Sequence, residues 1–161
     1  MLEHMDEYIV EIIEDESKGP PSVSGVGYAR IGSDKTQYDL FFTNRRIIVA
    51  TVFSQSDISE VTAIAAFQTI ANWKKSREKA RQRFKGKTPD EILNLHDDNY
   101  EIPYDNIKSV KLKKGLANAK LIVEVIWRGN QESVILKIPK KRIQDIETLL
   151  HMYLPGKVVS L

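Results

Sequence analysis

The chain has no cysteine among its 161 residues, and this absence excludes several kinds of chemistry. Disulfide bonds, thiolate metal ligands and a cysteine nucleophile all require the missing side chain. The sequence also lacks any stretch of about 20 apolar residues, the length that a membrane-spanning helix requires. Its N-terminus begins acidic and has neither the basic region nor the long apolar run of a signal peptide. We therefore expect a cytoplasmic protein without a transmembrane segment.

Catalytic and cofactor-binding motifs are missing as well. No Gly-rich phosphate loop follows a predicted strand, and no serine stands in a nucleophile-elbow pattern. The three histidines are far apart, and His96 is followed by Asp97 and Asp98, which could contribute to a cation site. A solvated loop is the ordinary interpretation of these residues, so we expect no catalytic residue, cofactor or metal. An enzyme is the alternative of a different class, recognisable if His96, Asp97 and Asp98 converge in a pocket.

Charge is distributed unevenly along the chain. The net charge is only +2, yet residues 72–87 hold eight Lys or Arg and one acid, Glu78. The first sixteen residues hold seven acids and no Lys or Arg. A chain of this length has the size of one domain, which we place at residues 1–161. Within it, the basic segment either faces a partner or is neutralised inside the protein or its oligomer.

Strands are predicted at about 7–54, before a long helical segment. Residues 8–13 alternate as in a strand, and residues 23–31 form a second strand interrupted by glycines. Two apolar runs then flank Asn44 and Arg45. Because Asn tolerates positive φ, these runs predict a tight β-hairpin.

The segment of about 57–98 is predicted to be helical. Asp57 and Ser59 are candidate N-caps of a helix that ends near Phe84, and Gly86 follows as a stop signal. The first half of this helix is apolar nearly all round. In the second half one narrow face at helical spacing carries Trp73, Arg77, Ala80 and Phe84.

A second helix start follows at once. Thr88 is a predicted N-cap, Pro89 occupies the first helical position, and Glu91 completes a capping box.

Strands return at about 100–139, with a turn at Gly129 and Asn130, and an amphipathic helix is predicted at about 140–154. The order of the predicted elements along the chain contains no alternating strand–helix units. It predicts a mainly β fold: a curled antiparallel sheet or barrel of about seven strands, closed by the C-terminal helix. The helical segment is then an insertion between the two half-sheets.

Two segments resemble the bacterial and archaeal pleckstrin-homology-like (PH-like) domains. "YDLFFTNRRIIV" is similar to that group's strand–LTNxR–strand hairpin, and "IPYDNIKSVKL" is similar to its IPYxDIxSV strand entry. The resemblance extends over most of residues 7–154 and implies a binding module. Many lipid-binding members of the wider superfamily carry several cations in the loop after the first strand. Here that loop has Lys18 alone, so the familiar phosphoinositide site is not implied.

The basic helix, residues 72–87, is either a merely solvated surface or has one of three functions. It could contact an anionic membrane surface or, with less support, nucleic acid. Candidate contacts with such an anionic partner are Lys74, Lys75, Lys79, Arg81, Arg83, Lys85 and Lys87.

The interpretation that we favour slightly is self-association, which gives a homo-oligomer or a protein partner. Acidic N-terminal residues of a neighbouring subunit would then oppose the cations. The candidate assembly face consists of Val61, Ile64, Phe67, Ile70 and Trp73.

Overall fold

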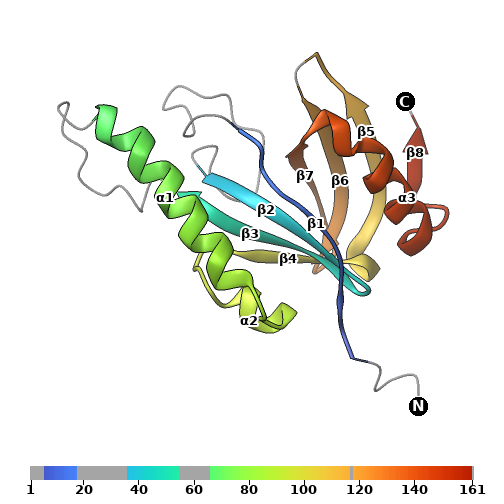
Figure 1. Cartoon of the computed structure of the whole chain (residues 1–161). Helices are drawn as coiled ribbons and strands as arrows, with labels where there is room; N and C mark the ends of the chain where they lie inside the picture. Colours follow the sequence, from blue (N-terminus) through green and yellow to red (C-terminus); the bar gives the residue numbers. More distant parts are fainter. Residues whose placement is uncertain (1–5, 18–35, 55–65, 117, 161) are drawn as a thin grey trace.

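Eight strands form two sheets in the computed structural model, which describes residues 6–17, 36–54, 66–116 and 118–160 (Figure 1). Sheet A has the order β1-β2-β3-β4 and sheet B the order β7-β6-β5-β8. The strands of sheet A are β1 (Ile9–Ile13), β2 (Thr36–Thr43), β3 (Arg46–Ser54) and β4 (Tyr100–Pro103). Those of sheet B are β5 (Ile107–Lys114), β6 (Ala119–Trp127), β7 (Asn130–Ile138) and β8 (Val158–Ser160). The helices are α1 (Ala66–Phe84), α2 (Pro89–Leu93) and α3 (Ile143–Tyr153).

Sheet A is covered on both faces. Its inner face, with Leu40 and Val49, packs against sheet B and α3 in the larger core. Its outer face, with Phe41, Ile48 and Val52, forms a second core with residues of α1 and α2. This double coverage explains why the apolar run of β3 is nearly continuous rather than alternating.

The helical insertion occupies a different place in the topology from the predicted one. It connects β3 to β4, which pair antiparallel within sheet A, with Ile47 opposite Ile102. The prediction that it separates two half-sheets was therefore wrong. Because the insertion joins neighbouring strands of one sheet, α1 and α2 lie on the outer face of that sheet, away from sheet B (Figure 1).

The C-terminal helix packs where its amphipathic pattern indicates. The four apolar residues of α3 that enter the larger core are Ile143, Ile146, Leu149 and Leu150. A short 3-10 turn, Lys140–Arg142, precedes the helix. After it β8 pairs in parallel with β5, an eighth strand that the sequence pattern did not predict. Closure into a barrel stays a prediction, because the pairing of the described strands stays within each sheet.

Local start and stop signals are confirmed at several positions. Thr88 and Glu91 form the predicted capping box of α2. Gly86 has a positive φ of 71°, as expected after a helix end. The β6–β7 turn lies one residue earlier than predicted: Arg128 and Gly129 both have positive φ, and Asn130 begins β7.

Three sequence predictions lie outside the described residues. These are the strand at 23–31, the N-caps Asp57 and Ser59, and the part of the long helix that precedes Ala66.

Candidate functional site

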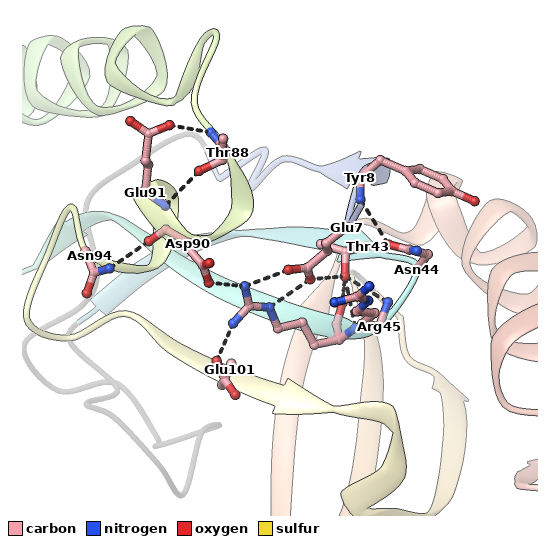
Figure 2. Close-up of polar contacts among 11 residues, drawn as sticks. Glu7, Tyr8, Thr43, Asn44, Arg45, Thr88, Asp90, Glu91, Asn94 and Glu101 are labelled. Atoms are coloured by element: carbon pink, nitrogen blue, oxygen red, sulfur yellow. Dashed lines mark hydrogen bonds and ion pairs between the residues drawn. The ribbon is translucent and has the colours of Figure 1, made fainter. Parts of the chain in front are cut away.

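A partly buried arginine, Arg46, lies at the β2–β3 turn and binds three carboxylates. Arg46 donates from Nε to Glu7 Oε2 at 2.8 Å and from Nη2 to Glu7 Oε1 at 2.7 Å. Its Nη2 also lies 2.6 Å from Asp90 Oδ1, and its Nη1 lies 2.5 Å from Glu101 Oε2 (Figure 2). Burial lowers the pKa of Arg46, but the carboxylate hydrogen bonds outweigh burial and raise that pKa above its ordinary value. The cluster ties the N-terminal segment, α2 and β4 to the hairpin.

The turn beside Arg46 is held by side chains rather than by a positive φ. Thr43 Oγ1 accepts hydrogen bonds from the backbone N–H groups of Arg45 and Arg46, both at 3.0 Å. Asn44 Oδ1 accepts from the backbone N–H of Tyr8 at 2.9 Å (Figure 2). Among the described non-glycine residues only Arg128 has positive φ, so the hairpin is confirmed but the expected conformation of Asn44 was wrong.

The two segments that carried the family resemblance meet at this turn. Tyr104, from the second segment, donates its hydroxyl to the Thr43 carbonyl at 2.5 Å and its backbone N–H to the Arg45 carbonyl at 3.0 Å. Its ring stacks on that of Tyr153 in α3, with centroids 5.7 Å apart. Tyr104 therefore joins the β2–β3 turn to α3.

The inner face of α1 docks on β2. Trp73 is fully buried, and its indole Nε1 donates to the side-chain oxygen of Gln37. Phe84 is also buried and meets Phe41 edge to face, with centroids 5.1 Å apart. The guanidinium of Arg77 lies 4.3 Å from the centre of the Trp73 ring. The predicted narrow face is confirmed, and it packs on the chain's own sheet.

Arg81 binds acids of its own chain. It lies 2.9 Å from both carboxylate oxygens of Asp39, a residue of β2 that is only 1% exposed. It also donates to the Asp15 carbonyl at 2.7 Å and lies 3.6 Å from Glu14. Burial raises the pKa of Asp39, and Arg81 partly offsets that rise.

The predicted opposition between the N-terminal acids and the basic helix is therefore real within one chain. Arg77 also contacts the N-terminal segment, where it donates to the Ser17 carbonyl at 2.8 Å. The sequence interpretation places the opposing acids on a neighbouring subunit, but Arg81 contacts Glu14 and Asp39 of its own chain.

A basic groove lies beside this packed face, between α1 and β3. Its volume is about 260 Å³. Lys79 and Arg83 line it from the helix, four residues apart, so both cations reach the same space. Ser76, Thr51 and His96 add hydroxyl and imidazole groups to its lining. Cations beside hydroxyl donors are the groups that bind a phosphate or a carboxylate.

The predicted anion contacts separate into two groups. Arg81 is engaged with Asp39, so we remove it from the candidate partner surface. The exposed members are Lys74, Lys75, Lys79, Arg83, Lys85 and Lys87. Of these, Lys79 and Arg83 enter the groove. The convergence of His96 on the groove was missed, because residues 79 and 96 come together only when α1 folds back on β3.

The structure removes one residue, Trp73, from the predicted assembly face. Trp73 is buried against β2, so it cannot contribute to an exposed face. Val61 and Ile64 lie outside the described residues, and only the backbone is described for Phe67 and Ile70. The rest of this face stays a prediction.

The His96–Asp98 segment lies beside a second hollow, at the end of α2. His96 and Asp97 line it with Asn94 and Glu101. The backbone N–H of Asp98 donates to His96 Nδ1 at 3.0 Å, which leaves Nε2 as the proton-bearing nitrogen of the neutral ring. Across the described ranges no group of three or more potential metal ligands is present. None of the described helices is both long and apolar enough to span a membrane.

Comparison with known proteins gives one family and one solved structure. The family model described as "Bacterial PH domain" matches residues 91–151, from α2 to α3. No curated protein matches the chain. Among solved structures, the hSac2 domain from human phosphoinositide phosphatase Sac2 is similar, with 11% sequence identity and a TM-score of 0.48. The similarity covers 97% of this chain and 78% of that chain.

Proposed function

We propose that the protein is a non-catalytic binding module of the PH-like type that holds an anionic group in the groove beside α1. The match of residues 91–151 to the bacterial PH domain family model supports this proposal. The observation that carries this proposal is the convergence of Lys79, Arg83 and His96 on one groove. We further propose that residues 1–161 form one domain whose sheets make a PH-like barrel closed by α3. The core shared by both sheets and α3 supports this part of the proposal.

The partner that best fits the groove is an anionic membrane surface. Lys74, Lys75, Lys85 and Lys87 are exposed on the same segment of the chain. Each cation near an anionic membrane surface contributes about 1 kcal/mol. Trp73 and Phe84 are buried, so neither aromatic ring is available to insert into a bilayer or to stack on a base. Single-stranded nucleic acid, which binds through stacking platforms, is therefore the weaker alternative. Attraction to the membrane would be electrostatic and sensitive to salt.

The test compares two charge-matched pairs on the same segment. In Lys79→Gln/Arg83→Gln both groove cations are lost, whereas Lys85→Gln/Lys87→Gln removes two exposed cations beyond the helix end. Co-sedimentation measures binding to vesicles of phosphatidylserine and phosphatidylcholine. We expect the groove variant to bind about 30-fold more weakly, because two contacts of about 1 kcal/mol each are lost. The affinity of the control variant for the vesicles is expected to fall by less than about fivefold, because its two exposed cations lie outside the groove and act only at a distance.

Two results would contradict the groove as the binding site. If both pairs weaken binding equally, the helix acts only through its total charge. If wild-type protein does not bind vesicles at low salt, the membrane proposal fails. Turnover of a phosphate ester that depends on His96 and Asp97 would instead favour an enzyme.

Self-association is the second candidate. Trp73 and Arg81 in the distal half of the long helix pack on the chain's own sheet, and we propose residues 61–70 of the proximal half as the contact with a second subunit. We expect sedimentation velocity to show a concentration-dependent oligomer at micromolar protein. Changing Ile64 and Ile70 to Asn should yield a monomer. A wild-type monomer throughout this range would exclude self-association as the function.

A further inference from the structure

Three lysines form a row across sheet B. The strand register places Lys113 of β5 opposite Lys120 of β6, and Lys120 opposite Lys137 of β7. Side chains alternate between the two faces of a sheet. The neighbouring residues Leu112, Leu121 and Leu136 form the matching row on the inner face, in or against the core. The lysine row therefore lies on the outer face.

The row places like charges side by side on neighbouring strands. Directly opposite residues on paired strands have Cβ atoms about 5 Å apart, and like charges at this distance repel. Here two such pairs share Lys120. The three cations extend in a line over two strand spacings, which is about 10 Å.

The row leads into a hollow at the end of β7. Lys137 lines this hollow of about 460 Å³ together with Lys140 and Lys141, which follow β7 in the chain. Asn118 and Ser17 also line the hollow. Its acidic members are Asp15 and Glu16, and Glu16 Oε1 lies 2.9 Å from Lys141 Nζ.

The opposite end of the row is also positive, because Lys114 follows Lys113 and Lys111 lies two residues before it on the same face. Lys113 lines another hollow at β5 with Glu147 of α3. On the same outer face Glu124 is bound to Ser133, with a hydrogen bond of 2.6 Å. The hollow at the end of β7 is lined by three lysines and the hollow at β5 by two.

We propose that this face binds a linear oligophosphate, which lies along Lys113, Lys120 and Lys137 and places its terminal group beside Lys140 and Lys141. The site is separate from the groove at α1 and does not depend on it. A chain of linked phosphates carries a negative charge on each unit, so it matches a line of cations that a single phosphate cannot match.

The outer face argues against other polyanions. None of its residues in β5, β6 and β7 that face the same side as the row is aromatic, so bases have no stacking platform. The hollow beside Lys140 and Lys141 can hold the end of a soluble oligophosphate better than it can contact a flat bilayer.

The test measures the affinity of the full chain for tripolyphosphate and for inorganic phosphate by titration calorimetry at low ionic strength. We expect tripolyphosphate to bind at least about tenfold more tightly than inorganic phosphate. The variant Lys113→Gln/Lys137→Gln retains Lys120 and should bind tripolyphosphate about tenfold or more weakly than wild type. Glu16→Gln should tighten binding by freeing Lys141.

Matched variants separate this site from general charge effects. Lys85→Gln/Lys87→Gln makes the same charge change on another part of the chain and should leave tripolyphosphate binding within about twofold. Lys79→Gln/Arg83→Gln should likewise retain it, so a failure at the α1 groove leaves this proposal standing. The proposal is overturned if Lys113→Gln/Lys137→Gln binds tripolyphosphate like wild type, or no more weakly than the control pair. It is also overturned if the row variant loses binding only to anionic vesicles or to an oligonucleotide.

Discussion

Replacing Arg81 with Met is expected to destabilise the protein by about 3–5 kcal/mol, because it leaves a buried carboxylate without its cation. Asp39 is 1% exposed, and Arg81 contacts both of its oxygens at 2.9 Å. Urea unfolding at neutral pH measures the loss. Lys85→Met on the exposed end of the same segment is the control, and we expect it to change stability by less than about 0.5 kcal/mol.

The loss from Arg81→Met should depend on pH. Burial raises the pKa of Asp39 in the folded protein above the unfolded value of 3.8, and Arg81 is the group that lowers it again. A carboxyl group with a raised folded pKa favours the folded state at acid pH, and this contribution is lost as the pH rises through the folded pKa. Removal of Arg81 raises the folded pKa further, so the destabilisation should be smaller near pH 5 than near pH 8.

A double variant tests whether the effect belongs to the pair. In Arg81→Met/Asp39→Asn the buried charge is absent, so a large part of the lost stability should return. If Arg81→Met alone costs less than about 1 kcal/mol, and equally at both pH values, then this ion pair does not hold α1 on sheet A.

Replacing Trp73 with Ala is expected to cost about 3–5 kcal/mol, a large share of the 5–15 kcal/mol that stabilises a typical domain. The side chain is completely buried between α1 and β2, and its loss also removes the hydrogen bond to Gln37 and the contact with Arg77. Denaturant unfolding gives the size of the effect, and far-UV circular dichroism shows whether α1 stays helical.

Trp73→Phe is the matched variant, because it retains an aromatic ring but not the N–H donor. We expect it to lose about 1–3 kcal/mol. An equal loss in both variants would mean that the hydrogen bond, rather than the packing, is the main contribution. A change of less than 1 kcal/mol in Trp73→Ala would contradict the docking of α1 through this residue.

The candidate site shows where sequence patterns stop being informative. The sequence identified Lys79 and Arg83 as cations on a helix, but it also grouped Arg81 with them, although Arg81 faces the sheet. These three residues lie within five positions of one another, and only contact with β2 and β3 distinguishes their surroundings. His96 joins the groove from the loop after α2, which no spacing rule relates to α1.

The sequence by itself determined the elements whose causes are local. Alternation over two residues predicted the strands, the Thr88–Glu91 spacing predicted the start of α2, and helical spacing predicted the packed face of α1. These features depend on neighbours within about four positions, so they can be read along the chain.

Only the tertiary structure decided the contacts between distant segments. Arg81 and Asp39 are 42 residues apart, and Arg46 and Glu101 are 55 residues apart. The placement of α1 on the outer face, the pairing of β8 and the lysine row all depend on which strands are neighbours and in which register. A one-residue change of register would turn each side chain to the other face, so such sites exist only once the sheets have formed.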